Sequence, residues 1–150
     1  MINHFKVFHQ EQPTDRENAI NDILQHIPKL LNMEQNKLLL RPVTIMEVEE
    51  ASNQLKARKA PRPDGFTSNF YHHFWDLIKA DVWNVVEESR EMHWLLPSLN
   101  STFIALIPKV AQPSTREKFR PIALCNVIYK IISKVIANRL KPLLPLLISP

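Results

Sequence analysis

The chain has 150 residues, of which 45% are hydrophobic, with one cysteine and one glycine beside twelve prolines. This length can bury one modest core, so we expect one domain or part of a larger one. A single cysteine excludes a disulfide framework and a cysteine-rich zinc site. Charged residues interrupt every apolar segment and no signal-peptide pattern opens the chain, so we expect an intracellular protein, nuclear or cytoplasmic, without a membrane span.

The charge is distributed unevenly along the chain. Residues 1–91 contain eleven Lys and Arg against fourteen Asp and Glu, whereas residues 92–150 contain eight against one, for a net charge of +4 overall. The single carboxylate of the second part is Glu117. A region this basic indicates a phosphate-rich partner such as nucleic acid or nucleotide. The alternative is a solvated face that only keeps the chain soluble.

Two helices are expected before residue 58. The first starts near Pro13 to Asp15 and runs to Gln25, with an apolar side formed by Ile20, Ile23, Leu24 and Ile27. The second starts at a capping box, Thr44 and Glu47, and reaches about Ala57, where basic residues suit the helix dipole. Its inward residues are expected to be Ile45, Val48, Ala51 and Leu55.

A turn and a long helical region follow. Pro63, Asp64 and Gly65 have turn chemistry, and the only glycine of the chain suggests a backbone angle that other residues disfavour. The alternative is an ordinary connection between helices. A helical region is predicted from Thr67 or Ser68 to about Met92, with a break near 79–81. Its inward residues are expected to be Phe70, Phe74, Leu77, Ile78, Val82, Val85 and Val86, with Trp75 and Trp83 nearby. We interpret these aromatic residues as core, the alternative being a base-stacking platform.

The stretch 101–141 predicts a β-hairpin followed by a helix. Two short apolar runs, Thr102 to Ile107 and Phe119 to Leu124, indicate antiparallel strands, and a helix is expected from Val127 to Leu140 with Asn126 as N-cap. Because two strands alone are marginal, we expect the helix to pack on them. The predicted fold class is α+β, mostly helical with a small antiparallel β-hairpin.

Positive side chains gather on this unit. Lys109, Arg116, Lys118 and Arg120 surround the loop, and Lys130 and Lys134 share the polar face of the helix with Lys141. The loop cations are suited to grip a triphosphate or a nucleic-acid backbone. Alternatively, they only discourage edge-to-edge aggregation. Arg139 falls on the apolar arc of the helix, where we expect a structural role, for example with helix-end carbonyls, rather than substrate contact.

No catalytic constellation is present in the pattern. Cys125 has no His and Asn partners at a family spacing, there is no glycine-rich phosphate loop, and no His-rich metal motif occurs. Two-metal phosphoryl or nucleotidyl transfer requires neighbouring carboxylates, which the basic part lacks. We therefore expect no catalytic residue, no metal site and no bound cofactor in this chain.

Several motifs together resemble a known family. KAPRPDGF, FYHHFW, LPSLNSTFIALIPK and FRPIALCNVIYKIISKVIANRLKPLLPLLIS resemble, in order, the N-terminal part of reverse transcriptases of plant-like non-LTR (LINE-type) retrotransposons, over roughly Leu38 to Pro150. The resemblance implies the fingers portion of a right-hand polymerase, with palm, thumb and catalytic aspartates absent. It divides the chain into a helical N-terminal extension, 1–58, and a partial reverse transcriptase domain, 59–150. The family pattern has glycine where this chain has Arg62.

The resemblance also implies roles for individual residues. Arg120 matches an arginine that contacts the incoming nucleotide, and Lys109 is the second candidate for nucleotide binding. The other residues implied in nucleic-acid binding are Pro63, Asp64, Gly65, Lys118, Lys130 and Lys134. The implied partners are an RNA template, a DNA primer and dNTP, and Mg²⁺ is expected only for the full-length family enzyme. Oligomeric state stays open.

Three hypotheses follow for function. The first is a truncated RNA-directed DNA polymerase, a nucleotidyltransferase fragment that is inactive alone. The second is a non-catalytic remnant that binds RNA or DNA. The third is a pseudogene product without function, whose apolar C-terminal residues would be exposed: Leu143, Leu144, Leu146, Leu147 and Ile148.

Overall fold

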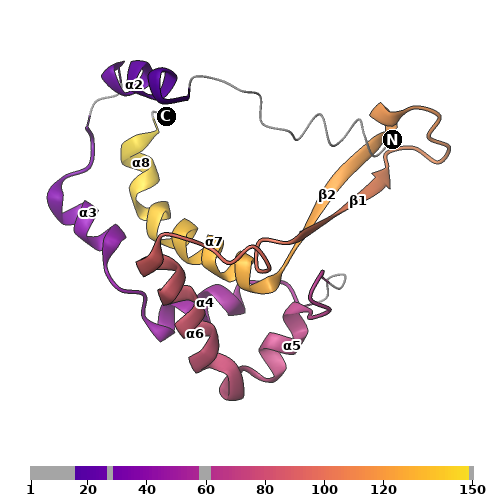
Figure 1. Ribbon diagram of the computed structural model, residues 1–150, viewed down its shortest axis with the longest axis horizontal. Helices are drawn as coiled ribbons and strands as arrows, with labels where there is room; N and C mark the ends of the chain where they lie inside the picture. The colour runs from indigo at the N-terminus through magenta and orange to yellow at the C-terminus, as the bar shows by residue number, and fades with distance from the viewer. Residues whose placement is uncertain (1–15, 27–28, 58–61, 149–150) are drawn as a thin grey trace.

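The computed structural model describes residues 16–26, 29–57 and 62–148, and this part of the chain is mostly helical with one two-stranded antiparallel sheet (Figure 1). The α+β fold class is therefore confirmed at this level. The described elements are α2 Arg16–His26, α3 Met33–Leu40, α4 Ile45–Asn53, α5 Ser68–His73, α6 Trp75–Met92, β1 Thr102–Pro108, η1 Arg116–Lys118, β2 Phe119–Cys125, α7 Val127–Leu140, η2 Lys141–Leu143 and α8 Leu144–Leu147.

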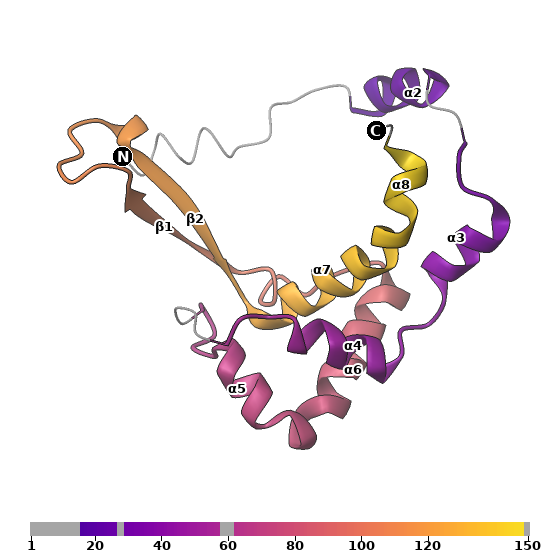
Figure 2. The same ribbon diagram turned by 180° about the vertical axis from the view of Figure 1, so that it is seen from behind.

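The core lies where α4, α6 and α7 meet, and α5 closes one end of it (Figure 2). Its buried apolar residues are Val43, Val48, Ala51, Tyr71, Trp75, Val82, Val86, Val127, Ile128, Ile131 and Val135. The fully buried ones come from α4 and α7 and are Val48, Ala51, Val127 and Ile131. Because α4 precedes residue 58 and α6 and α7 follow it, packing links the two predicted regions. Their division into 1–58 and 59–150 stays a prediction.

The capping box of α4 is confirmed, but the helix is shorter than expected. The Glu47 amide donates to Thr44 Oγ1 and the Thr44 amide donates to Glu47 Oε2, at 3.3 and 2.9 Å. The helix ends at Asn53 rather than Ala57, so no basic residue lies in its last turn. The Ser52 carbonyl instead accepts from the Leu55 amide at 3.0 Å and lies 2.8 Å from His72 Nε2. The carbonyl that would bond residue 56 is therefore occupied, and Ser and Asn are weak helix formers.

Helix α3 was not predicted. It begins at a second capping box, in which the Gln35 amide donates to Asn32 Oδ1 at 2.8 Å and the Asn32 amide donates to Gln35 Oε1 at 2.9 Å. The predicted helix near the N-terminus is present as α2, although its expected start lies outside the described residues. None of its described residues is buried, so Ile20, Ile23 and Leu24 do not face a core.

The predicted break in the long helical region is misplaced. The chain bends at Phe74, between α5 and α6, and α6 continues without interruption through residues 79–81. Phe74 packs its ring on Phe70, with centroids 5.0 Å apart, and is itself partly exposed. Leu77 is also wrongly predicted as inward, since it is 79% exposed. Tyr71 and Trp75 take the inward positions instead, so the aromatic residues do contribute to the core.

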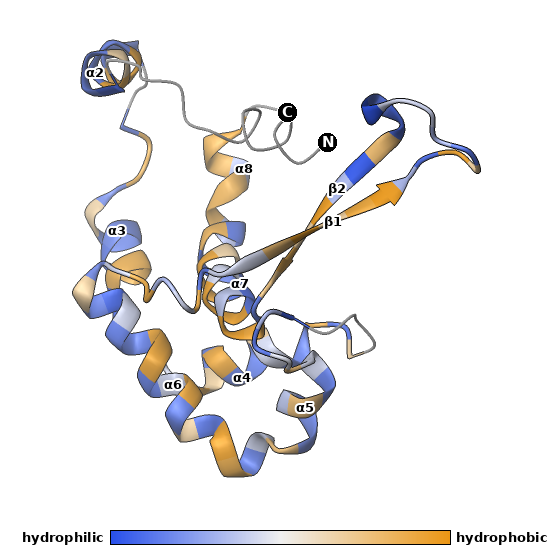
Figure 3. Cartoon of the chain, turned by 45° about the vertical axis from the view of Figure 1, so that its right-hand side comes forward, coloured by the Kyte–Doolittle hydropathy of each residue, from blue (hydrophilic) through white to orange (hydrophobic). Residues whose placement is uncertain are grey.

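Helix α7 has the predicted bounds, but it does not pack on the hairpin. Its buried residues face α4 and α6, and the hairpin projects away from the helices (Figures 1 and 2). Both strands therefore keep apolar side chains in solvent, with Phe103 59% exposed. Figure 3 colours much of the two strands as hydrophobic. The expectation fails because the apolar arc of α7 is already occupied. Asn126 is the N-cap residue of α7, as predicted, but its side chain makes no cap bond, and its Nδ2 donates instead to the Ser98 carbonyl at 2.9 Å.

Candidate nucleic-acid interface

The hairpin brings three of the predicted site residues to its tip: Lys109, Lys118 and Arg120. In the antiparallel register Ile107 lies opposite Arg120 and Pro108 opposite Phe119. The Lys109 amide donates to the Lys118 carbonyl at 2.7 Å, which continues this pairing one step past the strands. Lys109 directly follows β1, Lys118 ends η1 and Arg120 lies near the start of β2, so all three residues lie at the tip end of the ribbon.

Two lysines at the tip bond to the loop that they flank. Lys109 Nζ donates to the Glu117 carbonyl at 2.8 Å, and Lys118 Nζ donates to Ser114 Oγ at 2.9 Å. A hollow of about 570 Å³ lies beside this loop, lined by Pro113, Ser114, Thr115, Arg116, Glu117 and Phe119. The tip is therefore a folded loop with a defined surface.

The two arginines of the hairpin differ from the lysines. Arg116 lies in the short helical turn η1 and Arg120 on β2, and both side chains are exposed. Within the described ranges 16–26, 29–57 and 62–148, neither guanidinium has a hydrogen bond or an ion pair. A free guanidinium can grip two phosphate oxygens at once, so these groups are chemically suited to a phosphate-bearing partner.

The turn at 62–65 forms as its residues predict, despite Arg62. The Gly65 amide donates to the Arg62 carbonyl at 2.9 Å, and the Phe66 amide donates to Asp64 Oδ1 at 3.0 Å. Gly65 has a φ of 79°, which confirms the unusual backbone angle expected for it. Arg62 is 5% exposed, and its Nε has no hydrogen-bond partner. The glycine expected by resemblance at that position is therefore not required for the turn.

The remaining site candidates lie on α7. Lys130 and Lys134 are half-buried, and a four-residue step puts them on one face of the helix. The structure thus distributes the predicted site residues over three places: the hairpin tip, the turn before α5, and α7. The projecting hairpin separates its tip from the helical body (Figure 1).

Arg139 has the structural role that its position on α7 predicts. Its guanidinium bonds to both carboxylate oxygens of Glu47, to the carbonyl of Leu39 near the end of α3 and to the carbonyls of Arg41 and Pro42 after it. This hydrogen-bonded pairing lowers the pKa of Glu47 from 4.5 to about 2. Burial, with a smaller contribution from the charge of Asp64, raises the pKa of Tyr71 to about 12.

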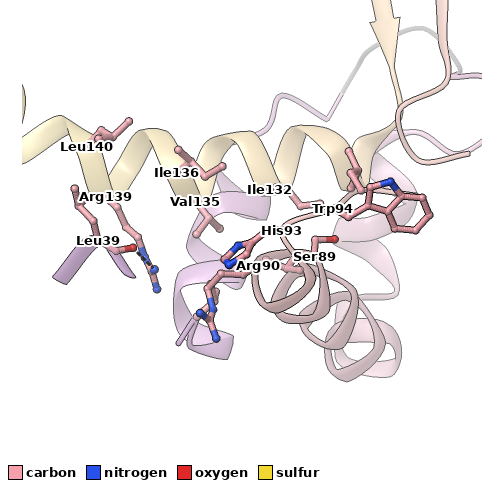
Figure 4. Close-up of a pocket in the computed structure, with 13 residues that line it drawn as sticks. Leu39, Ser89, Arg90, His93, Trp94, Ile132, Val135, Ile136, Arg139 and Leu140 are labelled. Carbon is pink, nitrogen blue, oxygen red and sulfur yellow. Dashed lines mark hydrogen bonds between the residues drawn. The ribbon is translucent and has the colours of Figure 1, made fainter. Parts of the chain in front are cut away.

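An apolar pocket of about 390 Å³ beside Arg139 was missed by sequence reasoning. It lies between α3, α6 and α7, and Figure 4 shows Trp94, Ile132, Ile136 and Leu140 along it. His93, at its edge, ends α6 with a left-handed backbone (φ 52°). The aromatic Trp94 just after a helix was the one signal in the sequence. Several separate elements form this pocket, which the sequence pattern alone does not reveal.

In the part of the chain that the structure describes, side chains do not gather as a magnesium site requires. Among the described residues no group of three or more His, Cys, Asp or Glu side chains lies close enough to share a metal ion. The basic part of the chain offers Glu117 as its only side-chain carboxylate.

Of the helices in the described ranges, none has both the length and the apolar character that crossing a bilayer requires.

Comparison with known proteins gives one informative match. The chain is 29% identical over 132 residues to a protein of Xenopus laevis described as "Transposon TX1 uncharacterized 149 kDa protein". The match covers 88% of this chain but only 10% of that relative's length. No protein-family model matches the chain. The printed description calls that relative a transposon protein, and this chain is similar to a tenth of its length.

Proposed function

We propose that the chain is a fragment of the RNA-directed DNA polymerase of a non-LTR retrotransposon, from its fingers portion. In this proposal the basic hairpin holds phosphate groups of an RNA template, a DNA primer or a dNTP. The ordered motifs of residues 59–150 and the similarity to a transposon protein support this origin. Because the chain spans a tenth of its relative, the activity of a whole polymerase is part of the proposal.

One observation carries the phosphate-binding part of the proposal. Lys109, Lys118 and Arg120 lie at the tip end of a projecting ribbon, joined by the Lys109 amide bond to the Lys118 carbonyl, and the loop adds Arg116. A cluster of cations on an exposed arm raises the local positive potential and attracts nucleic acid. The turn at Pro63 to Gly65 and the two lysines of α7, Lys130 and Lys134, are proposed as further contacts with the template.

The proposed reaction role is binding without catalysis. The basic part of the chain has one side-chain carboxylate, Glu117. The two metal ions of nucleotidyl transfer need several neighbouring carboxylates. With template, primer, Mg²⁺ and dNTP, we expect the isolated chain to produce no DNA. Robust primer extension by the purified chain would contradict this part of the proposal.

A second candidate function is a nucleic-acid-binding remnant that no longer serves a polymerase. The same free guanidinium groups of Arg116 and Arg120 favour it, because they need no catalytic partner to hold phosphate. Competition separates the two: a nucleotide-contacting finger should release RNA when dNTP is added, whereas a simple RNA binder should not.

A paired variant tests the hairpin in either case. Arg116→Met with Arg120→Met should weaken binding of a labelled oligouridylate about tenfold or more, because each charged contact contributes more than 1 kcal/mol. Lys37→Met with Lys79→Met removes the same charge from α3 and α6, where each lysine pairs with an acidic neighbour. Equal losses of affinity in the two double variants would mean that binding depends on the net charge of the chain alone.

A further inference from the structure

Lys109 closes the hairpin loop with two bonds. Its backbone amide donates to the Lys118 carbonyl at 2.7 Å and its side-chain Nζ donates to the adjacent Glu117 carbonyl at 2.8 Å. One residue at the end of the first strand therefore holds two consecutive carbonyls at the start of the second. This arrangement keeps the ammonium group over the loop.

Lys118 strengthens the same loop from the other side. Its amide donates to the Thr115 carbonyl at 3.2 Å and its Nζ donates to Ser114 Oγ at 2.9 Å. Together the two lysines bond to the loop on both sides of Arg116, which lies in η1. The position of the Arg116 guanidinium thus depends on a closed loop.

Arg116 and Arg120 differ from the two lysines, whose side chains bond to the loop. Both are exposed, and within the described part of the chain their guanidinium groups bond to nothing. Phosphate recognition favours a planar guanidinium, which can donate two parallel hydrogen bonds, over an ammonium already engaged by a carbonyl.

We propose that Lys109 is a positioning residue that closes the loop, and that Arg116 and Arg120 make the phosphate contacts at this end of the hairpin. The assignment rests on the proposed function, because it concerns the same basic surface. It gives the two nucleotide-binding candidates, Arg120 and Lys109, different roles.

Two measurements on the full chain test the assignment. The first is the rate at which trypsin cleaves after Arg116, followed by mass spectrometry. Lys109→Met should raise this rate about fivefold, since it removes one exposed hydrogen bond that keeps the loop closed. Lys109→Arg keeps a donor and should restore protection, and Lys37→Met should leave the rate unchanged.

The second measurement is the dependence of oligouridylate affinity on salt concentration. Arg120→Met should reduce the slope of log K against log salt by about 0.7, the value for one contact to a single strand. Lys109→Met should reduce the slope far less than Arg120→Met, because its ammonium group already bonds to the Glu117 carbonyl. A Lys109→Met slope reduced as far as that of Arg120→Met, with trypsin cleavage unchanged, would overturn the assignment.

Failure of the broader function gives a different result. If the wild-type chain binds no oligouridylate, the proposed function fails, and the phosphate roles of the two arginines fail with it. The trypsin comparison still decides the role of Lys109. Cleavage after Arg116 at the same rate in Lys109→Met and wild type would exclude loop closure.

Discussion

Arg139 on α7 forms a two-bond ion pair with Glu47 on α4, although 92 residues separate them. The Nε to Oε1 distance is 2.8 Å and the Nη2 to Oε2 distance is 3.0 Å. The same guanidinium also donates to the carbonyls of Leu39, Arg41 and Pro42, at 2.9, 2.7 and 3.0 Å. The end of α7 is thereby bonded to the α3–α4 connection and to the capping box of α4.

Replacing Arg139 should destabilise the fold strongly. Its side chain is 10% exposed and that of Glu47 is 18% exposed. Arg139→Met would remove two of the donors to the carboxylate and the Arg139 donors to three carbonyls. Removing one partner of a largely buried pair costs about 3 kcal/mol. Urea unfolding followed by circular dichroism measures the loss.

Arg41 provides the matched control for this variant. Arg41 Nη2 lies 3.3 Å from the same carboxylate, but its side chain is 51% exposed. Arg41→Met should cost less than about 1 kcal/mol, as exposed ion pairs do. Equal losses of unfolding free energy for the two variants would contradict the conclusion that Arg139 is the main stabilising partner of Glu47.

Acid should weaken the fold in a defined pH window. Arg139 lowers the pKa of Glu47 to about 2 in the folded chain, against 4.5 ordinarily. A carboxylate with a depressed folded pKa contributes its stability above pH 4.5, and that contribution disappears as the pH falls from 4.5 to about 2. The wild type should therefore lose stability in this window faster than Glu47→Gln, as measured by urea midpoints at each pH. Parallel curves for the two chains would exclude this pairing as the cause.

Replacing Gly65 should lower the stability of the fold through its backbone angle and not through a steric clash. Its φ is 79°, and no atom lies within 4 Å of where a Cβ would stand. Gly65→Ala should cost about 1–2 kcal/mol, the penalty for a left-handed residue with a Cβ. Gly65→Asn should cost less, because asparagine tolerates this conformation. Thermal unfolding gives the order, and an alanine variant as stable as wild type would contradict the strained turn.

The sequence predicted well where one signal was local and repeated. Seven apolar residues at helical spacing gave Val127–Leu140 its correct bounds, and both strands were found to within one residue. Thr44 and Glu47 marked the start of α4 because both halves of a capping box lie within one turn. The same kind of signal at Asn32 and Gln35 was present but overlooked.

Features that depend on distant parts of the chain were not predictable in the same way. The apolar arc of α7 indicates that something covers it, but not that α4 and α6 do so instead of the hairpin. The structural role of Arg139 was predicted from its place among apolar residues, whereas its partner Glu47 could not be found by spacing. The bend at Phe74 has no proline or glycine to mark it, and the apolar periodicity continues across it.

The candidate nucleic-acid interface was also predictable only in part. The positions of the cations around the loop between two predicted strands indicated that they would gather, and the pairing of the strand ends brings Lys109, Lys118 and Arg120 to the tip of the hairpin. The bonds from the two lysines to the loop depend on its folded shape, which composition does not determine. The binding roles of these residues stay predictions.

The salt dependence of RNA binding tests the central claim most directly. Fluorescence anisotropy of a labelled oligouridylate with the wild-type chain, titrated over roughly 50 to 200 mM salt, measures how many counterions binding releases. If the hairpin holds phosphates, log K falls linearly with log salt, with a slope near −1.4 for the two single-strand contacts of Arg116 and Arg120. A slope near zero, or no binding at the lowest salt, would contradict the account.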